Sequence, residues 1–86
     1  MRIKEGFVLR RVGEIGIVVP AEGVRKGFPL TLNDSGVFLW SILCEETDVA
    51  ELVQKMEQRY DVPMDIIAKD VRDFLRQIRK IGLLEE

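Results

Sequence analysis

The most constraining feature of this chain is an alternating strand pattern that runs directly into a capped helix pattern. Phe28, Leu30 and Leu32 alternate with Pro29 and Thr31, which predicts a strand with one buried face. Because a proline within a strand is normally confined to a sheet edge, this strand should have an open edge. An open edge can accept another strand.

The helix pattern begins immediately after this strand. Asn33, Asp34 and Ser35 are all good N-cap residues, and the sequence leaves open which of them caps the helix. A helix that starts here places four residues on one face. They are Gly36, Leu39, Trp40 and Leu43. A single tryptophan on such a stripe is more often a core anchor than a ligand contact.

Two further strands are predicted upstream, over Phe7–Val12 and Ile15–Val19. Both are rich in β-branched and apolar residues, and the intervening Gly13-Glu14 suits a type II′ hairpin turn. A polar loop, Ala21–Gly27, leads into the third strand. The three strands should form an antiparallel meander.

Two further helices are predicted downstream. Thr47 should cap a helix over about Asp48–Tyr60, and Pro63 suits the first position of the next one. The last helix has a one-sided core stripe and ends at Gly82. The stripe consists of Ile67, Val71, Phe74, Ile78 and Ile81. Leu83 and Leu84 should fold back onto the body, giving one α+β domain, residues 1–86, of three strands followed by three helices (βββααα).

The segment LTLNDSGVFLWSIL, residues 30–43, closely resembles the hallmark segment of the PqqD family, the small proteins of pyrroloquinoline quinone synthesis and related peptide-maturation pathways. Ser35 stands where that family usually has threonine. Val18-Val19-Pro20 and the segment 70–84 match two further family motifs, in the family's order. The resemblance implies a winged helix-turn-helix fold that acts as a recognition element for ribosomally synthesised and post-translationally modified peptides. Such a module holds the leader segment of a precursor peptide and presents it to a modifying enzyme, for example a radical S-adenosylmethionine maturase.

The resemblance also implies a site, in which the leader adds as a strand to the open edge and lies against the third helix. That helix carries a basic ridge of Lys69, Arg72, Arg76, Arg79 and Lys80. Ala68 and Leu75 flank the ridge on one side, and this flank is expected to face the peptide. The expected peptide contacts are Pro29, Leu30, Thr31, Leu32, Ala68, Arg72, Leu75 and Arg79. A solvated helix face explains the basic residues equally well.

Chemistry-bearing residues are scarce. The chain has no histidine and one cysteine, Cys44, which packing at a helix end or in the core explains. No glycine-rich nucleotide motif occurs. The sequence therefore predicts a binding protein, without catalytic residues, cofactor or metal.

Composition favours a folded cytoplasmic protein. The N-terminus lacks the apolar region of a signal peptide, and no apolar run is long enough to span a bilayer. The alternative function is a winged-helix DNA-binding regulator, which has a similar architecture. A net charge of −2 with a single basic helix face argues against nucleic acid as the partner.

Overall fold

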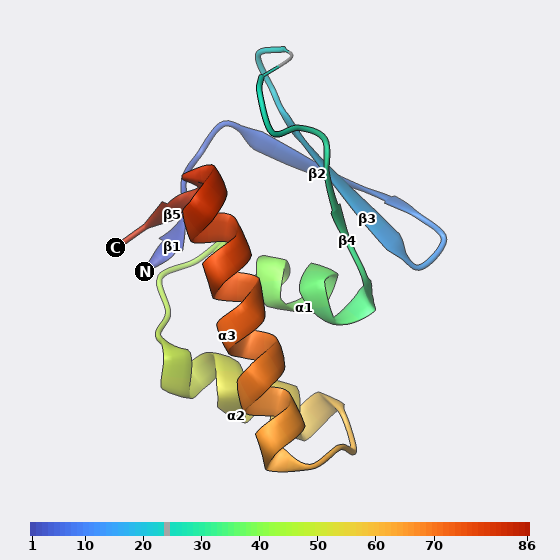
Figure 1. Ribbon diagram of the computed structural model, residues 1–86, viewed down its shortest axis with the longest axis vertical. Coiled ribbons are helices and arrows are strands. Elements are labelled where there is room, and N and C mark those ends of the chain that lie inside the picture. The colour runs from blue at the N-terminus through green and yellow to red at the C-terminus, as the bar shows by residue number, and fades with distance from the viewer. Residues whose placement is uncertain (24) are drawn as a thin grey trace.

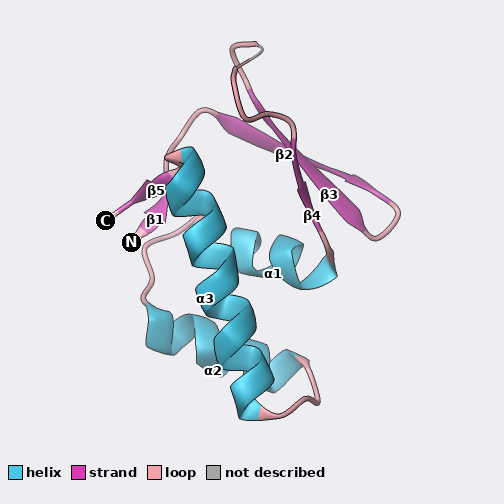
Figure 2. Cartoon of the chain, in the orientation of Figure 1, coloured by secondary structure: helices cyan, strands magenta, loops and turns pink. Residues whose placement is uncertain are grey.

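The computed structural model describes residues 1–23 and 25–86; Val24, in the predicted loop Ala21–Gly27, lies outside the described residues. A three-stranded antiparallel sheet lies on one side of the molecule, and three helices lie on the other (Figure 1). The α+β fold with three strands followed by three helices is confirmed (Figure 2). None of the helices in the described ranges is long and apolar enough to cross a membrane.

The sheet is built on a tight hairpin. β2 (Phe7–Val12) and β3 (Ile15–Pro20) pair antiparallel, with Val12 opposite Ile15. Gly13 has φ of 65°, and no described residue other than glycine has a positive φ, as the predicted type II′ turn requires. The hairpin is therefore confirmed.

β4 (Leu30–Leu32) pairs antiparallel with β3 and forms the edge of the sheet, whose strand order is β2-β3-β4. The predicted edge position is confirmed, but the strand is shorter than expected. Pro29 comes immediately before the paired residues rather than within them. Leu30 and Leu32 are buried and Thr31 is exposed, so the predicted alternation is correct.

α1 (Asp34–Leu43) follows β4 without a linker, and Asn33 is its N-cap. The Asn33 Oδ1 accepts a hydrogen bond from the Gly36 N–H at 2.9 Å, which decides among the three candidate caps. The predicted stripe is buried, including Trp40, which is 4% exposed. α1 approaches β3 very closely at Gly16, where a Cβ would lie 2.5 Å from Val37 Cγ2.

α2 (Val49–Arg59) and α3 (Met64–Ile81) both begin one position away from their predicted starts. Asp48, not Thr47, caps α2: its Oδ1 accepts the Glu51 N–H at 2.8 Å, while the Thr47 hydroxyl donates to the Glu51 carboxylate. Pro63 occupies the N-cap position of α3 rather than its first helical position. Both shifts lie within the usual uncertainty of helix ends.

The end of α3 follows the prediction. Gly82 adopts a left-handed conformation, with φ of 85°, and terminates the helix. Leu83 and Leu84 are buried, as expected. No local sequence pattern predicted the second, two-stranded sheet, in which β5 (Leu84–Glu85) pairs with β1 (Arg2–Ile3).

Candidate functional site

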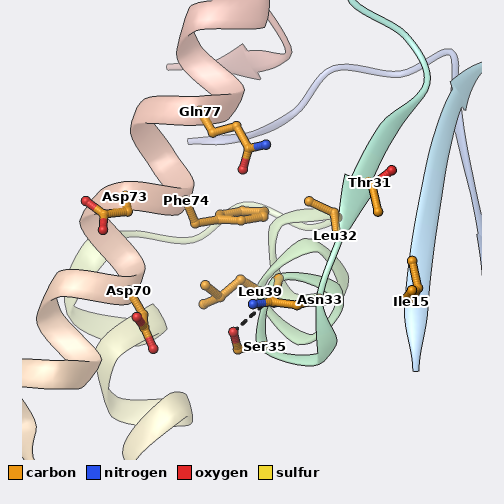
Figure 3. A pocket seen from close by; sticks show the side chains of 11 residues that line it. Ile15, Thr31, Leu32, Asn33, Ser35, Leu39, Asp70, Asp73, Phe74 and Gln77 are labelled. Atoms are coloured by element: carbon orange, nitrogen blue, oxygen red, sulfur yellow. Dashed lines mark hydrogen bonds between the residues drawn. The ribbon is translucent and has the colours of Figure 1, made fainter.

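An open groove of about 550 Å³ lies between the β4 edge and α3 (Figure 3). Its floor is apolar and consists of Leu32, Leu39 and Phe74. Its α3 rim is polar, with Asp70, Asp73 and Gln77. The remaining lining residues come from β3, β4 and the start of α1: Ile15, Thr31, Asn33, Ser35 and Gly36. A volume of this size is in the range of ligand-binding clefts.

The pairing of the hairpin determines which backbone groups face β4. The Ala21 N–H donates to the Gly6 carbonyl at 2.8 Å, so these two residues form a hydrogen-bonded pair just outside the paired strands. Hydrogen-bonded and non-hydrogen-bonded pairs alternate along an antiparallel ladder. Pro20, which has no N–H, falls on a non-hydrogen-bonded pair, consistent with this phase. By the same count, Gly16 and Val18 direct their N–H and C=O groups toward β4.

The same alternation of hydrogen-bonded and non-hydrogen-bonded pairs determines which backbone groups of β4 point to the open edge. Leu32 lies opposite Gly16 and Leu30 lies opposite Val18, so both leucines use their backbone groups within the sheet. Thr31 lies between them, and its N–H and C=O groups therefore point away from β3, toward the open edge. Thr31 is therefore the one residue of β4 that offers both a backbone donor and a backbone acceptor to an added strand.

The structure brings only part of the expected site to this groove. Thr31 and Leu32 line it, and Leu30 is buried beneath the sheet beside it. Pro29 is exposed next to the strand. None of the four expected residues on α3 lines the groove. They are Ala68, Arg72, Leu75 and Arg79.

The reason is the rotation of α3 about its axis. The helix turns the flank that carries Asp70, Asp73 and Gln77 toward β4, so the flank that was expected to face the peptide does not line the groove. Leu75 is only 3% exposed and belongs to the core. Ala68, Arg72 and Arg79 are exposed elsewhere on the helix. Contact between any of these residues and a peptide stays a prediction.

The basic ridge of α3 is partly neutralised within the protein. Lys69 Nζ lies 2.8 Å from Asp73 Oδ2, and Arg76 also pairs with Asp73, at 3.8 Å. Arg79 pairs with Glu86 at 2.9 Å. Such exposed pairs are weak, but they reduce the free positive charge on this face.

A second hollow of about 430 Å³ continues from the groove toward the β2–β3 turn and is lined in part by Asp34 and Tyr60. The Tyr60 hydroxyl donates to Asp34 Oδ2 at 2.6 Å. This hydrogen bond lowers the pKa of Asp34 below its ordinary value, and the charges of Arg59 and Arg11 act in the same direction. The interaction joins the end of α2 to the start of α1, next to the groove.

We expect Tyr60→Phe to be less stable than the wild type at neutral pH, because it removes the hydrogen bond to the ionised Asp34. A lowered pKa in the folded state contributes stability above the unfolded-state pKa, near 3.8, and this contribution is lost as the pH falls through the folded-state value. The difference in urea midpoint between the two proteins should therefore shrink between about pH 7 and about pH 2.5. An equal difference at both pH values would contradict the assignment.

Sequence reasoning missed Asp70, Phe74 and Gln77 as groove residues. They recur at helical spacing along one border of the core stripe, which is a recognisable signal for a residue row at the edge of a buried face. The other border carries an equivalent row, however, so periodicity could not distinguish the two.

Two of three comparisons with known proteins found a match. A search of curated proteins found no significant match. Among solved structures, the chain is similar to TbiB1 in complex with the TbiA(beta) leader peptide, with 27% identity and a TM-score of 0.78 over 99% of this chain and 95% of that one. The family model for coenzyme PQQ synthesis protein D (PqqD) matches residues 17–84. This match covers most of the chain, including the edge strand and all three helices, and the chain therefore belongs to the PqqD family.

Proposed function

We propose that this protein captures the leader segment of a ribosomally made precursor peptide and presents it to a modifying enzyme. The leader adds as a strand to β4 and lies in the groove against α3. The enzyme partner is a maturase, of which a radical S-adenosylmethionine enzyme is the type that the family resemblance favours. The protein itself contributes binding rather than catalysis.

The observation that carries this proposal is the open β4 edge beside an apolar groove. In strand addition, main-chain hydrogen bonds supply affinity and side-chain pockets supply specificity. Thr31 offers the outward backbone groups, while Leu32, Leu39 and Phe74 offer a pocket for a side chain of the added strand. The similarity to TbiB1, whose structure holds a leader peptide, supports this assignment.

The charge distribution favours a peptide over DNA. Binding to duplex DNA at physiological salt depends on a cluster of basic residues that neutralise phosphates. Here Lys69, Arg76 and Arg79 already pair with carboxylates of the same chain. The groove itself is lined by two aspartates, Asp70 and Asp73, which would repel a phosphate backbone.

The test is a titration of the ¹⁵N-labelled protein with the leader segment of the precursor encoded nearest to its gene. We expect a Kd of about 10 µM or tighter, equivalent to roughly −7 kcal/mol. The largest amide shift changes should fall on 30–33 and 70–77, on the two sides of the groove. Residues 52–59 of α2 should change little.

A duplex DNA of random sequence serves as the comparison ligand and should cause no comparable changes at the same concentration. Tight duplex binding with no response to the leader would favour the DNA-binding regulator instead. Shift changes confined to the β2–β3 turn would show that the leader binds outside the groove.

A further inference from the structure

The groove has two chemically different parts. Phe74 points into its middle, where Leu32 and Leu39 complete the apolar floor, whereas Asp70 lies toward the end where Ser35 stands in the first turn of α1 (Figure 3). Any strand that follows β4 would therefore pass an apolar region and then an acidic one. No lysine or arginine is among the described residues that line the groove.

The two aspartates differ in how far they are already neutralised. Asp73 pairs with Lys69 and Arg76, and the hydrogen bond from Lys69 lowers its pKa. Asp70 is half-buried, and it makes no ion pair or side-chain hydrogen bond with any residue in 1–23 or 25–86. The groove thus keeps an unpaired carboxylate beside its apolar floor, which is complementary to a cation.

The N-terminus of α1 offsets this negative charge only in part. A helix N-terminus attracts anions when its N–H groups are free. Here the Asn33 side chain already accepts the Gly36 N–H, and Asp34 occupies the first turn. The capped N–H and the Asp34 carboxylate therefore weaken the attraction of this helix end for anions.

The pairing of an added strand with Thr31 determines how far apart its groove-facing residues are in sequence. A residue of an added strand that pairs with Thr31 points to the same side of the sheet as the exposed Thr31 side chain, away from the apolar floor of the groove. Its two neighbours point into the groove. Groove-facing residues are thus two positions apart: the one opposite Leu32 lies near Phe74, and the next one beyond it, past the C-terminal end of β4, lies near Asp70.

We propose that this groove selects leader segments in which an apolar residue and a lysine or arginine are separated by one residue, the basic side chain pairing with Asp70. The inference rests on the proposed function and specifies its ligand. The order of the two residues reports the direction of the added strand. Asp70 lies toward the C-terminal end of β4, so an antiparallel strand carries basic-x-apolar and a parallel strand carries apolar-x-basic.

The probe is a displayed library of random 12-residue peptides, selected against the wild-type protein and against Asp70→Asn. Peptides enriched by the wild type should carry the spaced apolar and basic pair, and the preference for the basic residue should disappear with Asp70→Asn. A selected peptide should bind Asp70→Asn about threefold to fivefold more weakly, the effect expected of a partly exposed ion pair. Asp65→Asn, an exposed carboxylate in the first turn of the same helix, is the matched control and should bind as the wild type does.

The outcomes separate this inference from the function on which it rests. Peptides that shift amides on both sides of the groove but show no basic preference, with Asp70→Asn unchanged, would overturn the inference alone. A selection that enriches no peptide, or only peptides that leave the groove amides unshifted, would overturn the proposed function as well.

Discussion

Trp40→Ala should lower the free energy of unfolding by about 3–5 kcal/mol, the usual cost of removing a large aromatic side chain from a core. Trp40 is 4% exposed, on the face of α1 that packs into the core with Leu39 and Leu43. A cavity left at this position would affect α1, whose residues Ser35, Gly36 and Leu39 line the groove. Urea unfolding followed by circular dichroism measures the change.

Ser41→Ala is the matched control, because Ser41 is the exposed neighbour of Trp40 on the same helix. Its stability should stay within about 0.5 kcal/mol of the wild type. If Trp40→Ala unfolds at the wild-type urea concentration but no longer binds the leader, the tryptophan is a contact residue and its assignment to the core is wrong.

The sequence was sufficient to predict the secondary-structure elements whose patterns depend only on nearby residues. Alternation at 28–32, the capping residues at 33–35 and the i, i+3, i+4 spacing of α1 each depend on neighbours a few residues apart, and all three are present in the structure. Gly13 and Gly82 mark a turn and a helix end through their own backbone conformations. The β1–β5 pair lacks any such signal, because each strand has only two residues and its partner lies at the other end of the chain.

The groove illustrates what local patterns leave undetermined. Periodicity shows that α3 has a core stripe with a border on either side, but which border faces β4 depends on how the whole helix packs. Leu75 lies at one border and was expected at the peptide, yet packing places it in the core. Leu75→Ala should accordingly behave as a core truncation, since it removes buried apolar volume. The opposite border, with Asp70 and Gln77, forms the groove.

The largest expected effect on binding is that of Thr31→Pro, which should weaken the leader's affinity by at least about tenfold, roughly 1.4 kcal/mol. The substitution removes the outward N–H of the one β4 residue that offers both backbone groups to an added strand. It also places a pyrrolidine ring at the position where the added strand would approach. A hydrogen bond contributes about 0.5–1.5 kcal/mol, and the ring adds a steric barrier.

The domain should tolerate this change, and that is what makes the test decisive. Thr31 forms a non-hydrogen-bonded pair with Ile17, so proline removes no bond from the β3–β4 ladder, and edge strands accept proline on their outer side. Leu30, which would precede the proline, is already extended, as that position requires. Thr31→Val is the control, because it keeps the backbone N–H and the branched shape of the side chain while removing the hydroxyl. If Thr31→Val binds the leader normally and a folded Thr31→Pro does not, recognition runs through the main chain of β4. If both bind as the wild type does, the leader occupies another surface and strand addition at β4 is wrong.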